Sequence, residues 1–178
     1  SVVAVTRMGH HANFCPWQKL VKRKKAKFEI IELTTDLRLN PKEIDRVLAL
    51  KPIILAITMM SNVTGVLNPI SSIAARFKMV GSTIVVDAAQ GMAHGEVNLD
   101  RLGPVDFMAF SSHKLCGPTG VGVLWGREAL LEKMPPYQLG GNMISHVGDF
   151  DSEWNELPHK FEAGTPDIAG VIGFGASI

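Results

Sequence analysis

The chain of 178 residues contains only two cysteines and one tyrosine, and its formal net charge is +1. Cys15 and Cys116 lie far apart and match no zinc-binding or Cys-x-x-Cys spacing, so we expect a reduced, cytoplasmic protein without a metal site. The balanced charge gives no reason to expect nucleic acid or an anionic membrane as a partner. No apolar run reaches the ~18 residues that a membrane span requires.

An initiator methionine and a signal peptide are also missing from the sequence. The chain opens on an apolar, strand-like run at residues 1–6 and stops inside an apolar, helix-like run at residues 173–178. Both ends therefore look cut, and we expect residues 1–178 to be an internal piece of a longer protein.

The composition itself, 46% apolar and 20% charged, is that of a soluble globular protein large enough to bury a core. Apolar runs of strand length alternate with helical patterns, which is typical of an α/β fold with a mainly parallel sheet and helices on both faces. The link between residues 110 and 121 is too short for a crossover helix, so the last strand is expected to run antiparallel to its neighbour. Strands are expected at residues 2–5, 28–33, 53–57, 83–86, 105–110 and 121–125.

Helix-start signals and apolar spacing predict three helices between these strands. Asn40 followed by Pro41 is an N-cap and a first-turn residue for the second helix. Ser71 or Ser72 is available to cap the third. The helices are expected at residues 17–25, 41–50 and 70–79.

Two further segments are candidates for surface roles. The basic residues 22–25 are interpreted as the solvated face of a helix in preference to a docking patch. Beyond Pro136 the alternation dissolves, and the acidic, aromatic residues 149–156 are expected to form a loop that shapes a site or an interface.

One polar segment follows the strand expected at residues 105–110. It reads SSHKLCGP at residues 111–118 and places Lys114 among serine, histidine, glycine and proline. Such a lysine suits a Schiff base with an aldehyde beside a bound phosphate, for which Ser111 and His113 are donors. A surface lysine in a turn is the plainer alternative. Asp87, 114 − 87 = 27 residues earlier and also at a strand end, suits the partner of a protonated pyridine nitrogen. Together they predict pyridoxal phosphate (PLP) chemistry.

Other polar residues also follow strand ends, and in an open parallel sheet such residues meet at one edge. Gln90 could hydrogen-bond to a ring hydroxyl, and His10 or His11 could stack on a ring or move a proton. Asn62 could contact the cofactor or the substrate. Taken singly, Asp87 could instead be a helix cap, Asn62 a turn residue and the histidines a loop pair.

The two cysteines are weak candidates for chemistry. Nothing adjacent to Cys116 makes a thiolate there, so we do not expect it to be a nucleophile. Cys15 is expected to be a small buried apolar side chain.

These segments together resemble the class V aminotransferase family of fold-type I PLP enzymes, and within it the cysteine desulfurase and selenocysteine lyase group. The sequence HHAN at residues 10–13, followed by PWQ at residues 16–18, is similar to the corresponding segment of that group. The resemblance covers essentially the whole chain. Further similar segments, in the family's order, are SNV at 61–63, NPI at 68–70, DAAQ at 87–90, the Lys114 segment and FEAGTP at 161–166.

The resemblance implies a role for each candidate residue. Lys114 would form the Schiff base with PLP, Asp87 would pair with the ring nitrogen, and His10 would stack on the ring and take part in catalysis. The other implied contacts are Gln90 with the ring oxygen, Ser111 and His113 with the phosphate, and Asn62 near the substrate or the ring hydroxyl.

The resemblance also implies partners and a reaction. Thr165 would reach the phosphate of the other subunit's cofactor, which implies a homodimer with shared sites. L-cysteine, or L-selenocysteine, would be converted to L-alanine. The sulfur would pass as an enzyme persulfide to iron–sulfur cluster assembly or to another acceptor protein.

By the same resemblance, residues 1–178 are the central part of the large PLP-binding domain. The N-terminal segment is absent, as is the small C-terminal domain with the persulfide-forming cysteine and the substrate-carboxylate arginine. We therefore expect this piece alone to be inactive as a desulfurase. Gly9, Cys116 and Asp167 stand where the family usually has Glu, Tyr and Asn, and are expected to tune the site. The alternatives are another class V enzyme (an aminotransferase, a kynureninase-like hydrolase or an epimerase-like relative) and a truncated, non-catalytic product that binds PLP or a partner subunit.

Overall fold

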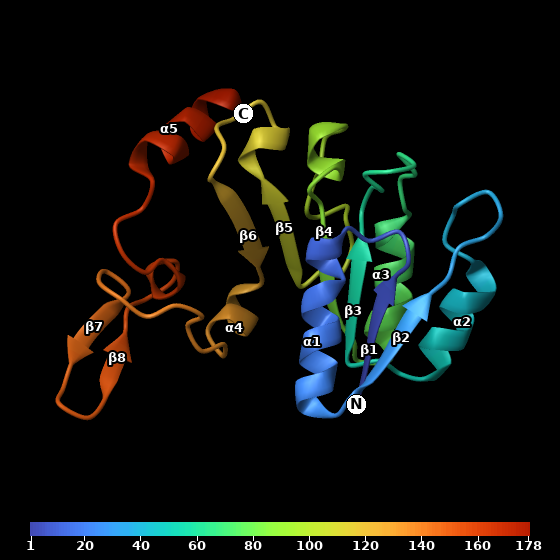
Figure 1. The fold of residues 1–178 in the computed structure, drawn as a ribbon, viewed down its shortest axis with the longest axis horizontal. Helices are drawn as coiled ribbons and strands as arrows, with labels where there is room; N and C mark the ends of the chain where they lie inside the picture. Colours follow the sequence, from blue (N-terminus) through green and yellow to red (C-terminus); the bar gives the residue numbers. More distant parts are fainter.

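The structure of the chain, a computed structural model, describes all residues from 1 to 178. Its main sheet contains β1 (Val2–Thr6), β2 (Lys27–Ile31), β3 (Ile54–Thr58), β4 (Thr83–Asp87), β5 (Phe107–Ser111) and β6 (Gly122–Gly126). The strand order is β2-β1-β3-β4-β5-β6 (Figure 1). The first five strands are parallel and β6 is antiparallel to β5, so the predicted α/β fold and the reversal of the last strand are confirmed.

Helices α1 (Cys15–Lys24), α2 (Pro41–Ala49) and α3 (Ile70–Met79) connect the parallel strands. Figure 1 shows α1 in front of the sheet and α3 behind it. The cap of α2 is as predicted, because the Asn40 Oδ1 accepts a hydrogen bond from the Lys42 N–H at 3.0 Å. The predicted serine cap of α3 is wrong: Pro69 takes the cap position, so the serines fall inside the first turn and the Ser72 hydroxyl donates to the Pro69 carbonyl.

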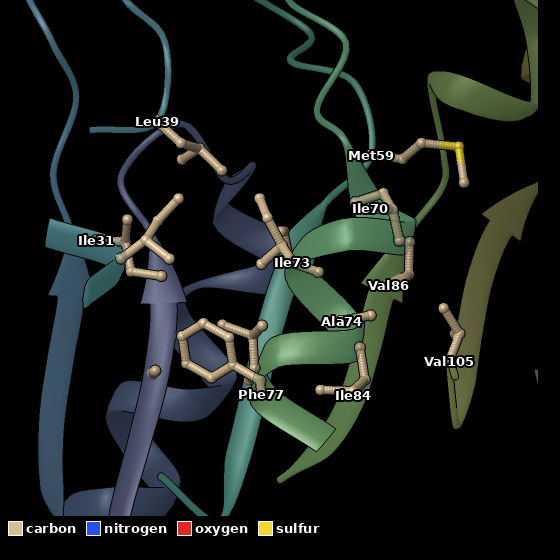
Figure 2. Packing of buried hydrophobic residues seen from close by; sticks show 14 of the residues in the cluster. Ile31, Leu39, Met59, Ile70, Ile73, Ala74, Phe77, Ile84, Val86 and Val105 are labelled. Carbon is tan, nitrogen blue, oxygen red and sulfur yellow. The ribbon is translucent and has the colours of Figure 1, made fainter. Parts of the chain in front are cut away.

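The core lies between the sheet and α3 (Figure 2). Phe77 of α3 is fully buried and packs in one cluster with Ile84 and Val86 of β4. Because side chains alternate along a strand, Val85 and Asp87 face the opposite side of the sheet. Because Ile84 and Val86 pack in the core cluster, Val85 and Asp87 are the residues of β4 whose side chains remain available for a site on the other face of the sheet.

After β6 the chain forms α4 (Glu128–Leu131), the strands β7 (Ile144–Val147) and β8 (Ser152–Trp154), and α5 (Ile168–Ser177). Strands β7 and β8 form a separate antiparallel hairpin, where only a loop was predicted for residues 149–156 (Figure 1). The strands are short and mostly exposed, so no alternation of buried and exposed residues marks them. None of the helices is long and apolar enough to cross a membrane.

The basic residues 22–25 are exposed at the end of α1, as expected of a solvated helix face. Cys15, at the start of the same helix, is exposed, so the prediction of a buried cysteine is wrong. The physical reason is that α1 buries only Val21, and the first turn of the helix lies outside that buried stripe.

Candidate active site

A cavity of about 530 Å³ opens at the carboxyl ends of β3, β4 and β5. Its volume is within the range of about 300–1,000 Å³ that small-molecule sites occupy. Seven of the eight residues predicted to form the site line it; they are His10, Asn62, Asp87, Gln90, Ser111, His113 and Lys114. The eighth, Thr165, is exposed and does not line this cavity.

Lys114 ends a short 3-10 helix, Ser112–Lys114, that directly follows β5. The Ser112 carbonyl accepts hydrogen bonds from the N–H groups of Leu115 (2.8 Å) and Gly117 (3.1 Å), which closes the turn. At Gly117 a Cβ atom would stand 2.3 Å from the Ser112 Oγ and 2.9 Å from the Phe174 ring, so this close approach requires glycine. Helix α5 thus braces the turn that presents Lys114.

Asp87 is the last residue of β4 and is half-buried. Its Oδ1 accepts a hydrogen bond from the Ala89 N–H at 3.0 Å. The Oδ2 has no hydrogen-bond partner in the chain and is free to face a ligand. Gln90, three residues further on, lines the same cavity.

His10 lies between β1 and α1, directly before a short 3-10 helix, His11–Asn13. Its Nδ1 accepts a hydrogen bond from the Ala12 N–H at 3.2 Å. The His11 ring is 5.7 Å away between centroids but does not line the cavity, so of the two histidines the structure places His10 at the site. The Trp17 indole N–H donates to the Asn13 Oδ1 at 3.1 Å and ties the short helix to α1.

Asn62 is presented by a tight turn after β3. The Ser61 hydroxyl accepts hydrogen bonds from the N–H groups of Val63 and Thr64, both at 3.2 Å. Asn62 is exposed and lines the cavity, so its amide is available to a ligand there.

An ion pair joins the loop that leads from β1 to His10 to the residue that follows β2. Arg7 donates to both carboxylate oxygens of Glu32, with its Nε at 2.9 Å from the Oε2. These hydrogen bonds lower the pKa of the Glu32 carboxyl and raise the pKa of Arg7. The pair lies outside the cavity.

The motif analysis did not single out two other residues that line the cavity, Asn13 and Thr58. Asn13 belongs to the HHAN segment and could have been found there. For Thr58 the only signal in the sequence is that it is a polar residue at the end of a strand. Neither Cys15 nor Cys116 lines the cavity, although both are exposed. The cavity therefore contains no thiol of this chain.

The donor set of the cavity fits PLP. It combines a free carboxylate oxygen of Asp87 with the Lys114 amine and the donors of Ser111 and His113. A pyridinium nitrogen requires the carboxylate, an aldehyde requires the amine, and a phosphate requires the donors. The Lys114 amine has no ion pair or hydrogen bond within the chain and is available to an aldehyde.

Comparisons with known proteins agree with this chemistry. The sequence model of the class V aminotransferase family ("Aminotransferase class-V") matches residues 1–178. Two similar curated proteins are named "Probable cysteine desulfurase". The one from Streptomyces coelicolor is 44% identical over 99% of this chain and 42% of its own length. The one from Halalkalibacterium halodurans is 45% identical over 99% of this chain and 43% of its own length.

Solved structures give the same result. The cysteine desulfurase CsdA from Escherichia coli superposes with a TM-score of 0.93 at 37% identity, over 99% of this chain and 44% of that one. A NifS-like protein from Rickettsia africae, at 21% identity, has a TM-score of 0.76 over 98% of this chain and 43% of that one, which shows likeness of fold alone. The chain thus spans less than half the length of the relatives it matches.

Proposed function

Because the chain belongs to the class V aminotransferase family, we propose that it is the cofactor-binding part of a PLP-dependent cysteine desulfurase. The observation that supports this most is the shared cavity, which is lined by Lys114, Asp87, His10 and the donors of the Lys114 turn. On this proposal, residues 1–178 are the central part of the large domain, and other segments of the protein complete the site.

The proposed binding role of each residue follows from its chemistry. Lys114 would hold the cofactor covalently through its aldehyde, and Ser111 and His113 would donate to the phosphate. Asp87 would keep the ring nitrogen protonated. At about 4 Å and an effective dielectric constant near 20, the attraction between the two charges is about 4 kcal/mol before desolvation. Gln90 would bind the ring oxygen.

When bound, PLP supplies an electron sink for bond changes at the substrate. The residues of this chain that line the cavity would orient the amino acid. The Lys114 amine would take up and return the proton of the substrate α-carbon, and Asn62 would contact the substrate from the rim. L-cysteine would then yield L-alanine, its sulfur passing to a cysteine thiolate as a persulfide. On this proposal that cysteine comes from another part of the protein, and no thiol of this chain lines the cavity.

The proposal extends to partners. Thr165 is exposed and away from the cavity of its own chain, which fits a contact with the phosphate in a second subunit of a homodimer. The persulfide sulfur would pass to an acceptor protein in the cytoplasm, with iron–sulfur cluster assembly as the proposed destination. L-selenocysteine is the alternative substrate.

Borohydride reduction of the full-length, PLP-loaded protein tests the assignment of Lys114. The pyridoxyl label should be found on Lys114 by peptide mass spectrometry, because only an imine is reduced and trapped in this way. Lys114→Ala should lose both the label and the release of alanine from L-cysteine, while retaining some PLP bound through the other contacts. The matched control Lys133→Ala, at an exposed lysine outside the cavity, should keep both. A label on any other lysine would refute the assignment.

The sequence of the gene beyond Ile178 separates the desulfurase from the alternatives. A C-terminal domain with an arginine and a loop cysteine supports the desulfurase. An intact domain without that cysteine would make the protein an aminotransferase or a lyase instead. A stop codon soon after Ile178 would make it a PLP-binding product without turnover.

A further inference from the structure

We propose that Lys160 is a positioning residue, which ties residues 136–166 to the end of α4 and so sets where Thr165 is presented to a second subunit. This inference rests on the proposed function, because it takes Thr165 as a contact of the cofactor phosphate in a partner copy. It names the side chain of this chain on which that contact depends.

Residues 136–166 leave the main sheet after α4 and return to it at α5, and they contain the hairpin of β7 and β8 (Figure 1). The backbone hydrogen bonds of this segment have both partners within it. The Asn155 N–H donates to the Met143 carbonyl at 2.9 Å. The Gly164 N–H donates to the Gly141 carbonyl at 2.8 Å. The segment is therefore tied to itself, and its place on the rest of the chain depends on side chains.

Lys160 makes the only hydrogen bonds that join this segment to the rest of the chain. Its Nζ donates to the Glu132 carbonyl at 2.8 Å and to the Leu131 carbonyl at 3.3 Å. No salt bridge joins the segment to the remaining residues. Leu131 is the last residue of α4, and no backbone N–H donates to the Glu132 carbonyl. Lys160 thus satisfies a free carbonyl at the end of this helix and fastens the segment there.

The Lys160 side chain is enclosed, because the residue is only 8% exposed. No carboxylate lies within ion-pair distance of its Nζ. The Nζ lies 5.4 Å from the centroid of the Phe161 ring, within the range of a cation–π contact. Hydrogen bonds are directional, whereas apolar contacts are not. Lys160 therefore fixes the orientation of the segment, which an apolar side chain of the same size would not do.

The position of Lys160 is passed on to Thr165 through a short stretch of backbone. Thr165 lies 165 − 160 = 5 residues further on and directly follows Gly164, whose N–H is tied to the segment. Asp167, two residues after Thr165, caps α5, the helix that braces the Lys114 turn. Thr165 thus lies between the segment that Lys160 holds and a helix that is held separately. A shift of the segment would move Thr165 relative to the sheet.

Titration of the full-length apoprotein with PLP gives the first readout. Thr165→Ala should weaken PLP binding about 10- to 150-fold, the size of one hydrogen bond to a charged group. Lys160→Met removes both hydrogen bonds with little change in side-chain length, and should weaken PLP binding at least about fivefold and no more than Thr165→Ala does. Lys160→Arg keeps the N–H donors and should restore most of the affinity. Lys133→Met, at an exposed lysine, is the matched control and should bind PLP as the wild type does.

The double variant separates positioning from a general loss of stability. If Lys160 acts through Thr165, Lys160→Met should weaken PLP binding little further in the Thr165→Ala background. A general loss of stability would instead multiply the two effects, and that result would overturn the inference. Wild-type affinity in the single variant Lys160→Met would overturn it as well.

Hydrogen exchange of the full-length apoprotein tests the tie without the cofactor. In Lys160→Met the amides of residues 136–166 should exchange faster, whereas those of the main sheet should keep their wild-type rates. Unchanged exchange in the segment would show that Lys160 does not hold it. If Lys160→Met does not fold, Lys160→Gln, whose side chain is one bond shorter, takes its place in both measurements.

The two proposals fail in different ways. If borohydride leaves no pyridoxyl label on Lys114 of the wild-type protein, the proposed function fails and this inference fails with it. If the label is present but Thr165→Ala binds PLP as the wild type does, the proposed contact with the second subunit fails, and this inference with it. If Thr165→Ala weakens PLP binding and Lys160→Met does not, only this inference fails.

Discussion

Replacement of Gly117 by alanine tests whether α5 and Ser112 brace the turn that presents Lys114. The added Cβ would stand 2.3 Å from the Ser112 Oγ and 2.9 Å from the Phe174 ring, whereas ordinary contact begins at 3.4 Å. To reach ordinary contact, the Ser112 Oγ would have to move away by 3.4 − 2.3 = 1.1 Å and the Phe174 ring by 3.4 − 2.9 = 0.5 Å. Overpacking of this kind costs about 1–3 kcal/mol. If the Lys114 turn yields, PLP binding should weaken by about 5- to 150-fold.

The assay is a titration of the full-length apoprotein with PLP, followed by absorbance. It is repeated in a Ser112→Ala background, because the Ser112 Oγ is buried without a hydrogen-bond partner and its removal should not weaken PLP binding. In that background the closest contact of the new Cβ is gone, so most of the Gly117→Ala penalty should disappear. Equal penalties in the two backgrounds would show that Ser112 is not the cause. No penalty in either would show that the turn is not braced.

Three further predictions concern stability. Phe77→Ala should lower the free energy of unfolding by about 3–5 kcal/mol, measured with urea, because the ring is fully buried. Asp106→Ala should cost about 1.5–3 kcal/mol, since the buried carboxylate accepts from the Ile84 N–H at 2.8 Å and pairs with Lys78. Asp106→Asn keeps an acceptor for the Ile84 N–H and should recover part of this loss; no recovery would place the loss in the ion pair with Lys78. The hydrogen bonds from Arg7 lower the folded-state pKa of Glu32. Their contribution to the free energy of unfolding is therefore complete above the unfolded pKa of about 4.3, and it is lost as the pH falls through the lower folded-state pKa. The melting temperature of Glu32→Gln, compared with wild type between about pH 6 and pH 3, should therefore fall less on the acid side.

Most of the fold could be predicted from the sequence because its signals are local. The six strands of the main sheet lie within two residues of the predicted runs, and the Asn40 cap of α2 is a contact between residues two apart. The cap of α3 was wrong because Pro69 competes with the serines for one position. The exposure of Cys15 could not be predicted, since it depends on which side of α1 meets the sheet.

The residues of the candidate site could be predicted from the sequence, but the way in which they are arranged around the cavity could not. The rule that ligands lie beyond the carboxyl ends of parallel strands placed Asp87 and Lys114 at one edge. The choice between His10 and His11 stayed open in the sequence, because both follow the same strand. It depends on the short helix after them, where the His10 side chain caps the Ala12 N–H and His11 does not line the cavity.

The alternation of side chains that builds the core also builds the site. In β4, Ile84 and Val86 belong to the core with Phe77, and Asp87 lines the cavity on the other face. A shift of β4 by one residue would exchange the two sets. Asp87 is therefore held in line with Lys114 by the same packing that stabilises the sheet. Phe77→Ala should accordingly weaken PLP binding as well as stability, although the ring does not line the cavity. A variant with the full loss of stability and unchanged PLP affinity would show that the core and the position of Asp87 are independent.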